Sequence, residues 1–290
     1  MTGRALVTGG TGFIGGQLAR RLVADGWRVT LLVRSPERVP ADLAGSCGVL
    51  PADPDGARFA AGVADAAPDV CFHLATHFVG VHTPADVDSM IATNVGLGTR
   101  LAEALSTRDD VAFVNIGTIW QHHGARPYGP SSLYAATKQA FVDVLRYYAE
   151  CTPLRAVTVE LSDTYGPGDP RTKLLQLLVQ AHRTGRPLQL SPGEQLVSFV
   201  HVDDVLDALL AAVPLADSAA PSFSAFGCTM TVREFVALVG RALGSQVPVE
   251  WGAREYRPRE MLQPWAVWPP VPGWAPRTDL LAGLRAVLAR

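Results

Sequence analysis

Short apolar runs alternate with helical patterns along the first half of the chain. The first run, residues 5–8, leads into a glycine-rich loop and then into a segment of helical apolar spacing that ends at Asp25-Gly26. Further runs typical of buried parallel strands lie at residues 28–33, 48–50, 69–76, 111–116 and 154–161. Because strands that alternate with helices build parallel sheets, the pattern predicts an α/β protein with a Rossmann-type, doubly wound parallel sheet.

The helical patterns lie between and after these strands. One long helix is expected over about residues 84–106, with Asn94 on one face, and another from about residue 132. Beyond residue 162 the alternation loosens. There the pattern predicts a helix that starts at Arg171 and a short strand at 196–200. It also predicts two more helices, one over about 202–213 and one from about 278.

No internal repeat or low-complexity linker divides the chain. We therefore expect a smaller C-terminal substrate domain that is interleaved with the first domain. The dinucleotide-binding domain would comprise residues 1–162 plus about 196–215, and the substrate-binding domain about 163–195 plus 216–290.

Composition narrows the function classes. The chain is 48% hydrophobic and 18% charged, with a net charge of -2, which gives no broad electrostatic reason to bind nucleic acid or a membrane surface. Its four cysteines are far apart and form no Cys-x-x-Cys pair, so neither a disulfide framework nor a metal site is expected. No charged-then-apolar leader precedes the first strand, and we expect a cytoplasmic protein.

The glycine-rich loop lies between a strand and a helix. Residues 9–15 read Gly-Gly-Thr-Gly-Phe-Ile-Gly. In this context glycines allow a tight turn, and the helix N-terminus faces a pyrophosphate, so the loop predicts dinucleotide binding.

Arg34 ends the second predicted strand, where an acidic residue would suit a free ribose 2′-hydroxyl. An arginine suits a 2′-phosphate, so NADPH is favoured over NADH as cofactor; a solvated arginine at a strand end is the other interpretation. Asp53 follows the third strand and is placed to meet the adenine edge, or to form a turn before Pro54.

Tyr134 and Lys138 lie four positions apart at the start of a predicted helix, so their side chains share one face. A neighbouring ammonium favours the phenolate and lowers the pKa of the phenol, which suits acid-base chemistry. Thr118, after the fifth strand, would bring a hydroxyl to the same sheet edge. The loop after the fourth strand contains His77, and the loop after Thr118 contains aromatic residues that would form a wall for a ring-shaped substrate, Trp120, His122, His123 and Tyr128.

These motifs together resemble a known family. The glycine loop, Asn94, Thr118, Tyr134-x-x-x-Lys138, and the segments Tyr-Gly-Pro-Gly at 165–168 and Phe-Val-His-Val-Asp-Asp at 199–204 resemble the extended short-chain dehydrogenase/reductases, the NAD(P)-dependent epimerase/dehydratase family. The residues around Thr118, Tyr134 and Asp163 look like the branch that contains CDP-abequose synthase and the 4-ketoreductases of antibiotic deoxysugar pathways.

The resemblance implies roles for individual residues. Tyr134 would protonate a carbonyl oxygen as hydride arrives, Lys138 would hold the nicotinamide ribose and depress the tyrosine pKa, and Thr118 would orient the carbonyl. Arg34 would hold the adenosine end, and the remaining cofactor contacts would be Gly9, Thr11, Gly12, Phe13, Ile14, Gly15, Leu74, Ala75, Thr76 and Asn94. The substrate would lie near His77, Thr118, Trp120, His122, Tyr134 and Asp163, with Arg171, Lys173 and Arg233 serving its diphosphate.

Departures from the family pattern sharpen the expected reaction. Thr118 replaces a commoner serine but keeps the hydroxyl, and Glu160 stands where much of the wider family has arginine. Family 4,6-dehydratases place an Asp-Glu pair directly after the hydroxyl residue, and this chain has Ile119 and Trp120 there. The related 3,5-epimerase/reductases have a cysteine at the position of Trp120. The expected reaction is therefore reduction of a carbonyl group, without elimination of water or epimerisation next to the ketone.

The leading hypothesis is an NADPH-dependent reductase acting on C4 of a nucleoside-diphosphate 4-keto-deoxysugar. Three alternatives stay open: an NAD-dependent nucleotide-sugar 4-epimerase, a reductase of a small non-sugar ketone, and a dinucleotide-sensing protein that has lost the chemistry. Arg34 argues against the epimerase, and an intact Tyr134 and Lys138 argue against the sensor. A homodimer through the helices after the fourth and fifth strands is the habit of the family.

Overall fold

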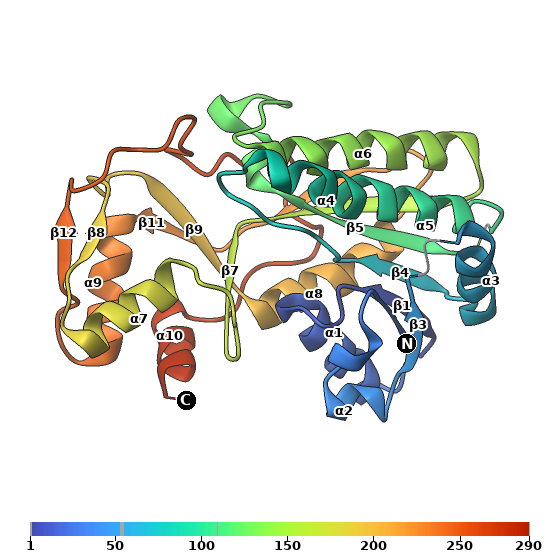
Figure 1. Ribbon diagram of the computed structural model, residues 1–290, viewed down its shortest axis with the longest axis horizontal. Helices are drawn as coiled ribbons and strands as arrows, with labels where there is room; N and C mark the ends of the chain where they lie inside the picture. Colours follow the sequence, from blue (N-terminus) through green and yellow to red (C-terminus); the bar gives the residue numbers. More distant parts are fainter. Residues whose placement is uncertain (1, 53–54, 109, 290) are drawn as a thin grey trace.

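The main sheet has seven parallel strands. The computed structural model describes residues 2–52, 55–108 and 110–289 (Figure 1). The strand order is β10-β6-β5-β4-β1-β2-β3, and every neighbouring pair is parallel. This arrangement confirms the predicted α/β fold with a Rossmann-type parallel sheet. The strands are β1 (Arg4–Thr8), β2 (Arg28–Val33), β3 (Gly48–Pro51), β4 (Val70–His73), β5 (Ala112–Thr118), β6 (Arg155–Leu161) and β10 (Ser222–Ala225).

Helices cover both faces of this sheet (Figure 1). One face packs against α1 (Phe13–Ala24) and α8 (Val202–Ala212). The other packs against α3 (Gly56–Ala66), α5 (Leu97–Leu105) and α6 (Leu133–Cys151). In β1, the successive residues Leu6 and Val7 are both fully buried, and they belong to the hydrophobic clusters on opposite faces. Burial on both faces explains why these strands are nearly continuous apolar runs.

A second group of elements lies at one end of the molecule (Figure 1). A three-stranded sheet has the order β11-β9-β7, and β12 pairs with β8 in parallel. Helices α7, α9 and α10 share a hydrophobic cluster with these strands. The elements are β7 (Asp163–Tyr165), α7 (Leu174–Thr184), β8 (Leu188–Leu190), β9 (Leu196–His201), β11 (Cys228–Thr231), α9 (Val232–Leu243), β12 (Val249–Trp251) and α10 (Leu280–Leu288).

The chain passes between the two groups more than once. β9 belongs to the three-stranded sheet, whereas α8, which follows it directly, packs under the main sheet. β10 returns to the main sheet beside β6, and the sequence pattern did not predict it. The segment around Pro269 and Val271 then runs along β10, where it exchanges backbone hydrogen bonds with Ser224. The division into two domains stays a prediction.

The long helix expected over about residues 84–106 is interrupted. A 3-10 turn at Pro84–Asp86 leads into α4 (Val87–Ile91), a π-helical turn at Ala92–Gly96, and then α5. A π turn inserts one extra residue into the helical ladder and is often found at functional sites. Here it carries Asn94, which is completely buried. Among the described residues, no helix is long and apolar enough to cross a lipid bilayer.

Candidate active site

The glycine loop connects β1 to the N-terminus of α1. Gly9 has a φ of 71°, and a Cβ atom there would lie 2.8 Å from the backbone carbon of Leu74. A Cβ atom on Gly15 would collide with the carbonyl oxygen of Gly9. These positions accept only glycine, so the loop folds tightly against the end of β4. The sequence therefore specifies a backbone cradle.

This cradle fits an anionic group. α1 begins with Gly12 as N-cap, has no side-chain cap hydrogen bond and has no acidic residue in its first turn. A hollow of about 160 Å³ at this helix end is lined by Thr11, Gly12 and Phe13, among others. Free backbone N–H groups at a helix N-terminus attract phosphate, as a dinucleotide pyrophosphate requires. Ile14 instead packs against the hydrophobic cluster, so its side chain supports the loop from below.

Arg34 follows β2 as an exposed side chain. It forms no hydrogen bond or ion pair with any residue that the structure describes, which leaves its guanidinium available to a ligand. Asp53, which was also expected near the adenine, lies outside the described residues. The role of Arg34 at the adenosine end stays a prediction.

The loop after β4 is pinned from two sides. The predicted strand over residues 69–76 ends at His73, because the N–H of Ala75 donates to the Thr8 hydroxyl at 2.9 Å instead of continuing the sheet. The same hydroxyl lies 3.0 Å from Nδ1 of His73. Leu74, Ala75 and Thr76 thus form the inner edge above the glycine loop.

Asn94 holds this loop against α6. Its amide oxygen accepts from the Thr76 hydroxyl and from the N–H of His77, at 3.0 and 2.7 Å. Its amide nitrogen donates to the carbonyl of His77 and to the hydroxyl of Thr137, at 3.1 and 3.0 Å. We expected Asn94 to contact the cofactor, but it is buried and its hydrogen bonds all go to protein. It is therefore a positioning residue for the loop and for the helix that bears Lys138.

Lys138 is a buried cation that has no hydrogen-bond or ion-pair partner among the described residues. It lies in the second turn of α6, which Ser132 caps by accepting from the N–H of Ala135. Only 2% of its surface is exposed, and within the described ranges no hydrogen bond or ion pair reaches its ammonium group. Burial lowers the pKa of Lys138 to about 8. An unpartnered buried ammonium fits a group that ligand hydroxyls complete, as the nicotinamide ribose would.

Tyr134 lies on the same face of α6. Burial raises the pKa of Tyr134 to about 12, while a hydrogen bond with Thr76 and the charge of Arg171 act in the opposite direction. The expectation that Lys138 depresses this pKa is therefore wrong for the free protein, because desolvation of the phenolate dominates. At neutral pH the phenol carries its proton, which suits a proton donor.

Two aromatic rings contact Tyr134. Phe78 lies edge-on to Tyr134 at 4.9 Å between ring centroids, and Trp120 lies at 6.4 Å. Phe78 and Trp120 also contact each other, and the guanidinium of Arg257 lies 5.8 Å from the Trp120 ring. Sequence reasoning missed Phe78 and Arg257. A phenylalanine in the loop after the fourth predicted strand, where ligands bind in this architecture, was a usable signal, whereas Arg257 comes from an irregular segment that carries none.

Thr118 ends β5 and begins the 3-10 turn Ile119–Gln121. The side-chain oxygen of Gln121 accepts from the Thr118 N–H at 2.9 Å, and the Thr118 hydroxyl accepts from the N–H of Trp120 at 3.3 Å. Helix α6 packs against both β5 and this turn. The hydroxyl and the Tyr134 phenol are thus carried by packed elements at the carboxyl edge of the sheet, where this architecture binds ligands.

His122 does not lie on the substrate wall. It is fully buried, with Nε2 at 2.8 Å from a carboxylate oxygen of Glu160 and Nδ1 at 3.0 Å from the carbonyl oxygen of Arg126. Both ring nitrogens are therefore engaged by protein, which corrects the expectation that it contacts substrate. His77 is half-buried, and its Nε2 has no partner among the described residues.

The predicted phosphate-binding cations differ in their surroundings. Arg171 forms an ion pair with Asp169 at 2.7 Å and lies 4.7 Å above the Phe13 ring, next to the glycine loop. Lys173 pairs with Asp163 at 3.0 Å. Both residues precede α7, so the helix begins after them and not at Arg171 as expected.

Arg233 lies in the second group of elements, at the start of α9. It pairs with Glu194 at 2.9 Å and stacks 4.5 Å from the Trp251 ring. No contact in the described chain connects it to Tyr134. The substrate roles of Asp163, Arg171, Lys173 and Arg233 stay predictions.

Comparison with known proteins defines the class. Residues 5–223 match the model of the NAD dependent epimerase/dehydratase family. The match spans the glycine loop, Tyr134 and Lys138, and it covers most of the chain. The protein belongs to this family, whose members are NAD(P)-dependent oxidoreductases, epimerases and dehydratases, and it is an enzyme of the nucleotide-sugar-modifying type.

Two relatives and one solved structure show the range of similarity. CDP-abequose synthase of Salmonella typhimurium is 25% identical over 98% of this chain and 97% of its own length. The dTDP-6-deoxy-L-talose 4-dehydrogenase (NAD(P)(+)) of Kitasatospora kifunensis is 30% identical over 85% of this chain and 80% of its own. The UDP-glucuronic acid 4-epimerase of Bacillus cereus, solved with UDP-glucuronic acid and NAD, has a TM-score of 0.84, 20% identity and coverage of 100% and 98%. This last likeness confirms the fold.

Proposed function

We propose that the protein reduces the C4 ketone of a nucleoside-diphosphate 4-keto-deoxysugar, TDP-linked, in deoxysugar or antibiotic biosynthesis. The observation that carries this proposal is the set of groups around Tyr134, where Phe78 and Trp120 pack against the phenol. Elimination or epimerisation beside the ketone needs a further acid or base. At the two positions directly after Thr118, where family dehydratases place an acid and a base, this chain has Ile119 and Trp120. The two relatives above, one named as a 4-dehydrogenase of a deoxysugar, support the same reading.

The chain supplies a proton donor and an oriented oxygen contact. Tyr134 holds its proton at neutral pH and would give it to the carbonyl oxygen as that oxygen gains negative charge. Thr118 would bind the same oxygen and fix its direction. Lys138 would bind ribose hydroxyls and place its charge near the phenolate that forms. The nicotinamide cofactor, when bound, supplies the hydride.

The substrate diphosphate would be bound by cations at the edge of the site. Arg171 and Lys173 each pair with an aspartate, so a phosphate would share these cations with Asp169 and Asp163. The charges of Arg171 and Asp163 both act on the Tyr134 phenol, which supports their closeness to the reaction centre. Arg233 would serve as an additional contact from the second group of elements.

NADPH is the cofactor that we infer within the NAD(P) class. The support is Arg34, an exposed cation after β2 that has no partner in the described chain. An arginine at this strand end can pair with a 2′-phosphate, whereas a free ribose hydroxyl would be served by a carboxylate.

The second candidate is an NAD-dependent nucleotide-sugar 4-epimerase. It is favoured by the overall likeness to a solved 4-epimerase that was crystallised with NAD. An epimerase returns the hydride to the same sugar, so it would retain a tightly bound cofactor and would show no net oxidation of added NADPH.

The direct test is an assay with purified protein, NADPH and dTDP-4-keto-6-deoxyglucose, followed by loss of NADPH absorbance. We expect turnover that falls by at least about 100-fold in Tyr134→Phe, because the variant lacks the donated proton but keeps the ring. Cofactor affinity, measured by calorimetry, should be unchanged in that variant. Interconversion of UDP-sugars without NADPH consumption would establish the epimerase instead, and retained turnover in Tyr134→Phe would refute the assigned proton donor.

We also infer a homodimer that forms through α4, α5 and α6. Figure 1 shows these helices together on one side of the sheet. Ile91 on α4 and Tyr147 on α6 are large apolar side chains with 45% and 61% of their surface exposed. Light scattering should give twice the chain mass, and Tyr147→Glu should shift the protein to a monomer. A cytoplasmic location stays a prediction.

A further inference from the structure

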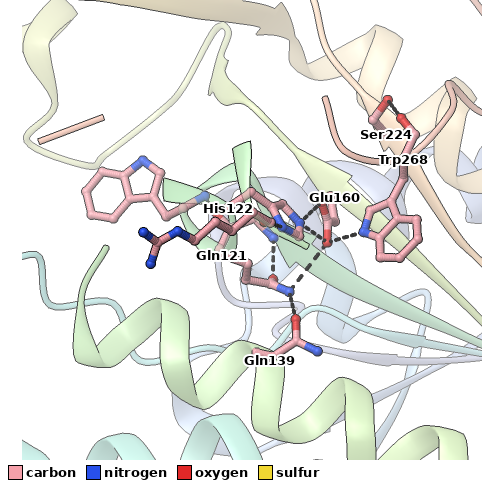
Figure 2. Close-up of polar contacts among 9 residues, drawn as sticks. Gln121, His122, Gln139, Glu160, Ser224 and Trp268 are labelled. Atoms are coloured by element: carbon pink, nitrogen blue, oxygen red, sulfur yellow. Dashed lines mark hydrogen bonds and ion pairs between the residues drawn. The ribbon is translucent and has the colours of Figure 1, made fainter. Parts of the chain in front are cut away.

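Glu160 is a buried carboxylate on β6 that three side chains contact (Figure 2). Only 2% of its surface is exposed. Nε2 of His122 lies 2.9 and 2.8 Å from its two oxygens, the indole N–H of Trp268 donates at 3.0 Å, and the amide of Gln121 donates at 3.4 Å. A buried charge is tolerated only when it has such partners. These donors come from the turn after Thr118 and from the C-terminal segment.

The geometry fixes how many protons His122 and Glu160 hold. Nδ1 of His122 faces the carbonyl oxygen of Arg126, which can only accept, so Nδ1 carries a proton. Nε2 faces the Glu160 carboxylate, so one more proton lies between the two groups. Because Trp268 and Gln121 also donate to Glu160, the carboxylate is the favoured charged form, and His122 is the imidazolium.

This pair lies beneath the turn that bears the reacting groups. The side chain of Gln121 donates to Glu160 and to Gln139 on α6, at 3.4 and 2.9 Å, and accepts the N–H of Thr118 at 2.9 Å. A Cβ atom at position 117 would lie 2.6 Å from Cγ of Glu160, so Gly117 makes room for the carboxylate. Gln121 thus binds Glu160 directly, and through its side-chain oxygen it also holds the N–H of Thr118 at the start of the turn Ile119–Gln121.

The segment between β12 and α10 reaches the pair through Trp268. Its carbonyl oxygen accepts from the Ser224 hydroxyl at 3.1 Å on β10, and its indole reaches Glu160 on the neighbouring strand (Figure 2). The segment that carries Trp268 follows Arg257, which lies over Trp120. The segment between β12 and α10 therefore contacts Glu160 through Trp268 and the Trp120 ring through Arg257.

We propose that Glu160 and His122 are positioning residues for Thr118 and the turn Ile119–Gln121 that follows it. In this proposal, Trp268 couples the C-terminal segment, which lies between β12 and α10, to these two residues. The pair sets the direction of the Thr118 hydroxyl and the Trp120 ring without touching substrate. The kinetic part of this proposal rests on the proposed reductase function. The protonation of the pair and the rigidity of the turn can be measured on the protein without substrate.

The first test is nitrogen NMR of the histidine rings in the cofactor-free protein. Among the described residues, Glu160 is the one ionisable side chain that bonds His122, and the next charged group is Asp143, which reaches the network through Gln139 at 3.3 Å. We expect both nitrogens of His122 to be protonated at pH 7.5, where an ordinary histidine of pKa about 6.5 is mostly neutral. In Glu160→Gln, Nε2 should lose its proton and accept from the new amide. An unprotonated Nε2 in the wild type would overturn the ion pair.

The second test follows hydrogen exchange at the Thr118 amide. Glu160→Gln keeps the shape and the hydrogen bonds, so we expect protection within about threefold of the wild type. Glu160→Ala removes the support of Gln121, so exchange at Thr118 should accelerate by about tenfold or more relative to amides in β1. Equal acceleration throughout the chain would reduce Glu160 to a global stability residue and would overturn the positioning role.

The third test separates Trp268 from the general stability of the C-terminal segment. Trp268→Phe removes the indole donor to Glu160, and Trp274→Phe removes a matched donor, to the Asp204 carbonyl at 2.8 Å, outside the network. We expect kcat to fall about tenfold in Trp268→Phe with KM and cofactor affinity unchanged, because misplaced reacting groups cost rate more than binding. Trp274→Phe should keep kcat. Equal losses in both variants would contradict the coupling, whereas a wild type without turnover would refute the reductase function and leave the two previous tests to decide.

Discussion

Two buried charges lie on neighbouring elements of this protein, and their surroundings differ. Lys138 on α6 and Glu160 on β6 each expose 2% of their surface. Three side chains donate to Glu160, while in the described chain no group accepts from Lys138. Burial lowers the pKa of the lysine to about 8, and burial also raises the pKa of the glutamate, against the effect of His122. We infer from this contrast that Lys138 is available to a ligand, whereas Glu160 stabilises the turn after β5.

The difference has a physical basis. A buried charge costs free energy unless partners replace its hydration. The protein meets this cost internally at Glu160, so the carboxylate is part of the fold of the turn after β5. At Lys138 the described residues supply no such partners in the free protein, so the desolvation free energy of the ammonium group would be offset only when ribose hydroxyls bind. Functional sites are expected where local rules of stability are broken in this way.

The largest expected effect is on turnover in Lys138→Met. The variant keeps the stem volume and loses the cation, so we expect at least a 100-fold loss of kcat/KM, about 3 kcal/mol in the barrier. Arg146→Met is the matched control, because Arg146 is an exposed cation on the same helix. Its kinetics should equal those of the wild type. Steady-state assays with the sugar substrate decide the comparison, and a Lys138→Met enzyme of normal rate would contradict the assigned role.

The partnered charge should show its effect in stability. His122→Phe leaves the Glu160 carboxylate buried without its cation, and we expect the free energy of unfolding to fall by about 3 kcal/mol. Adding Glu160→Leu should restore much of this loss, because both charges are then gone. His182→Phe is a suitable control, since His182 makes a single surface hydrogen bond, to Ser245. Denaturant titration measures the free energy of unfolding of the two single variants and the double variant. A His122→Phe variant as stable as the wild type would show that the pair is not ionic.

The main sheet, the glycine loop and helix α6 were predictable because their signals are local. Apolar runs predict the strands, and Gly15 is required by the close approach of the Gly9 carbonyl within the loop itself. The network around Glu160 was not predictable, because Trp268 is 108 residues away in sequence and reaches it through a segment that has no periodic pattern. The π turn at Asn94 was missed for a related reason, since its hydrogen bonds to the loop at His77 and to α6 exist only after the chain has folded.

Strand β10 shows the same limit. Its four residues Ser222–Ala225 alternate polar and apolar side chains too briefly for a confident strand pattern. They form a strand because β6 lies on one side and the segment around Pro269 on the other. The exact partners of His122 were likewise hidden, since a histidine in a loop carries no sequence signal of burial.

The unpartnered lysine should also make stability depend on pH. Its folded-state pKa of about 8 lies below the ordinary value of 10.5, so the folded chain binds this proton more weakly than the unfolded chain does. Lys138 therefore destabilises the cofactor-free protein by up to about 3 kcal/mol below pH 8, and the penalty shrinks as the pH rises toward 10.5. Lys138→Met should be more stable than the wild type at pH 7, and the gap should narrow at pH 10. A constant gap would contradict this account, and saturating cofactor should close it at every pH.

The smallest expected effect concerns Arg34, a charge that is exposed and so is largely screened by solvent. Arg34→Ala should weaken NADPH binding by about tenfold, near 1.4 kcal/mol, because an arginine at this position contacts a 2′-phosphate that NADH lacks. Affinity for NADH should stay the same. Arg186→Ala removes another exposed cation, just beyond α7, and should change neither affinity. Calorimetric titrations of both cofactors test this. Equal affinities in the wild type, or NAD that copurifies with the protein, would remove the support for NADPH and favour the 4-epimerase.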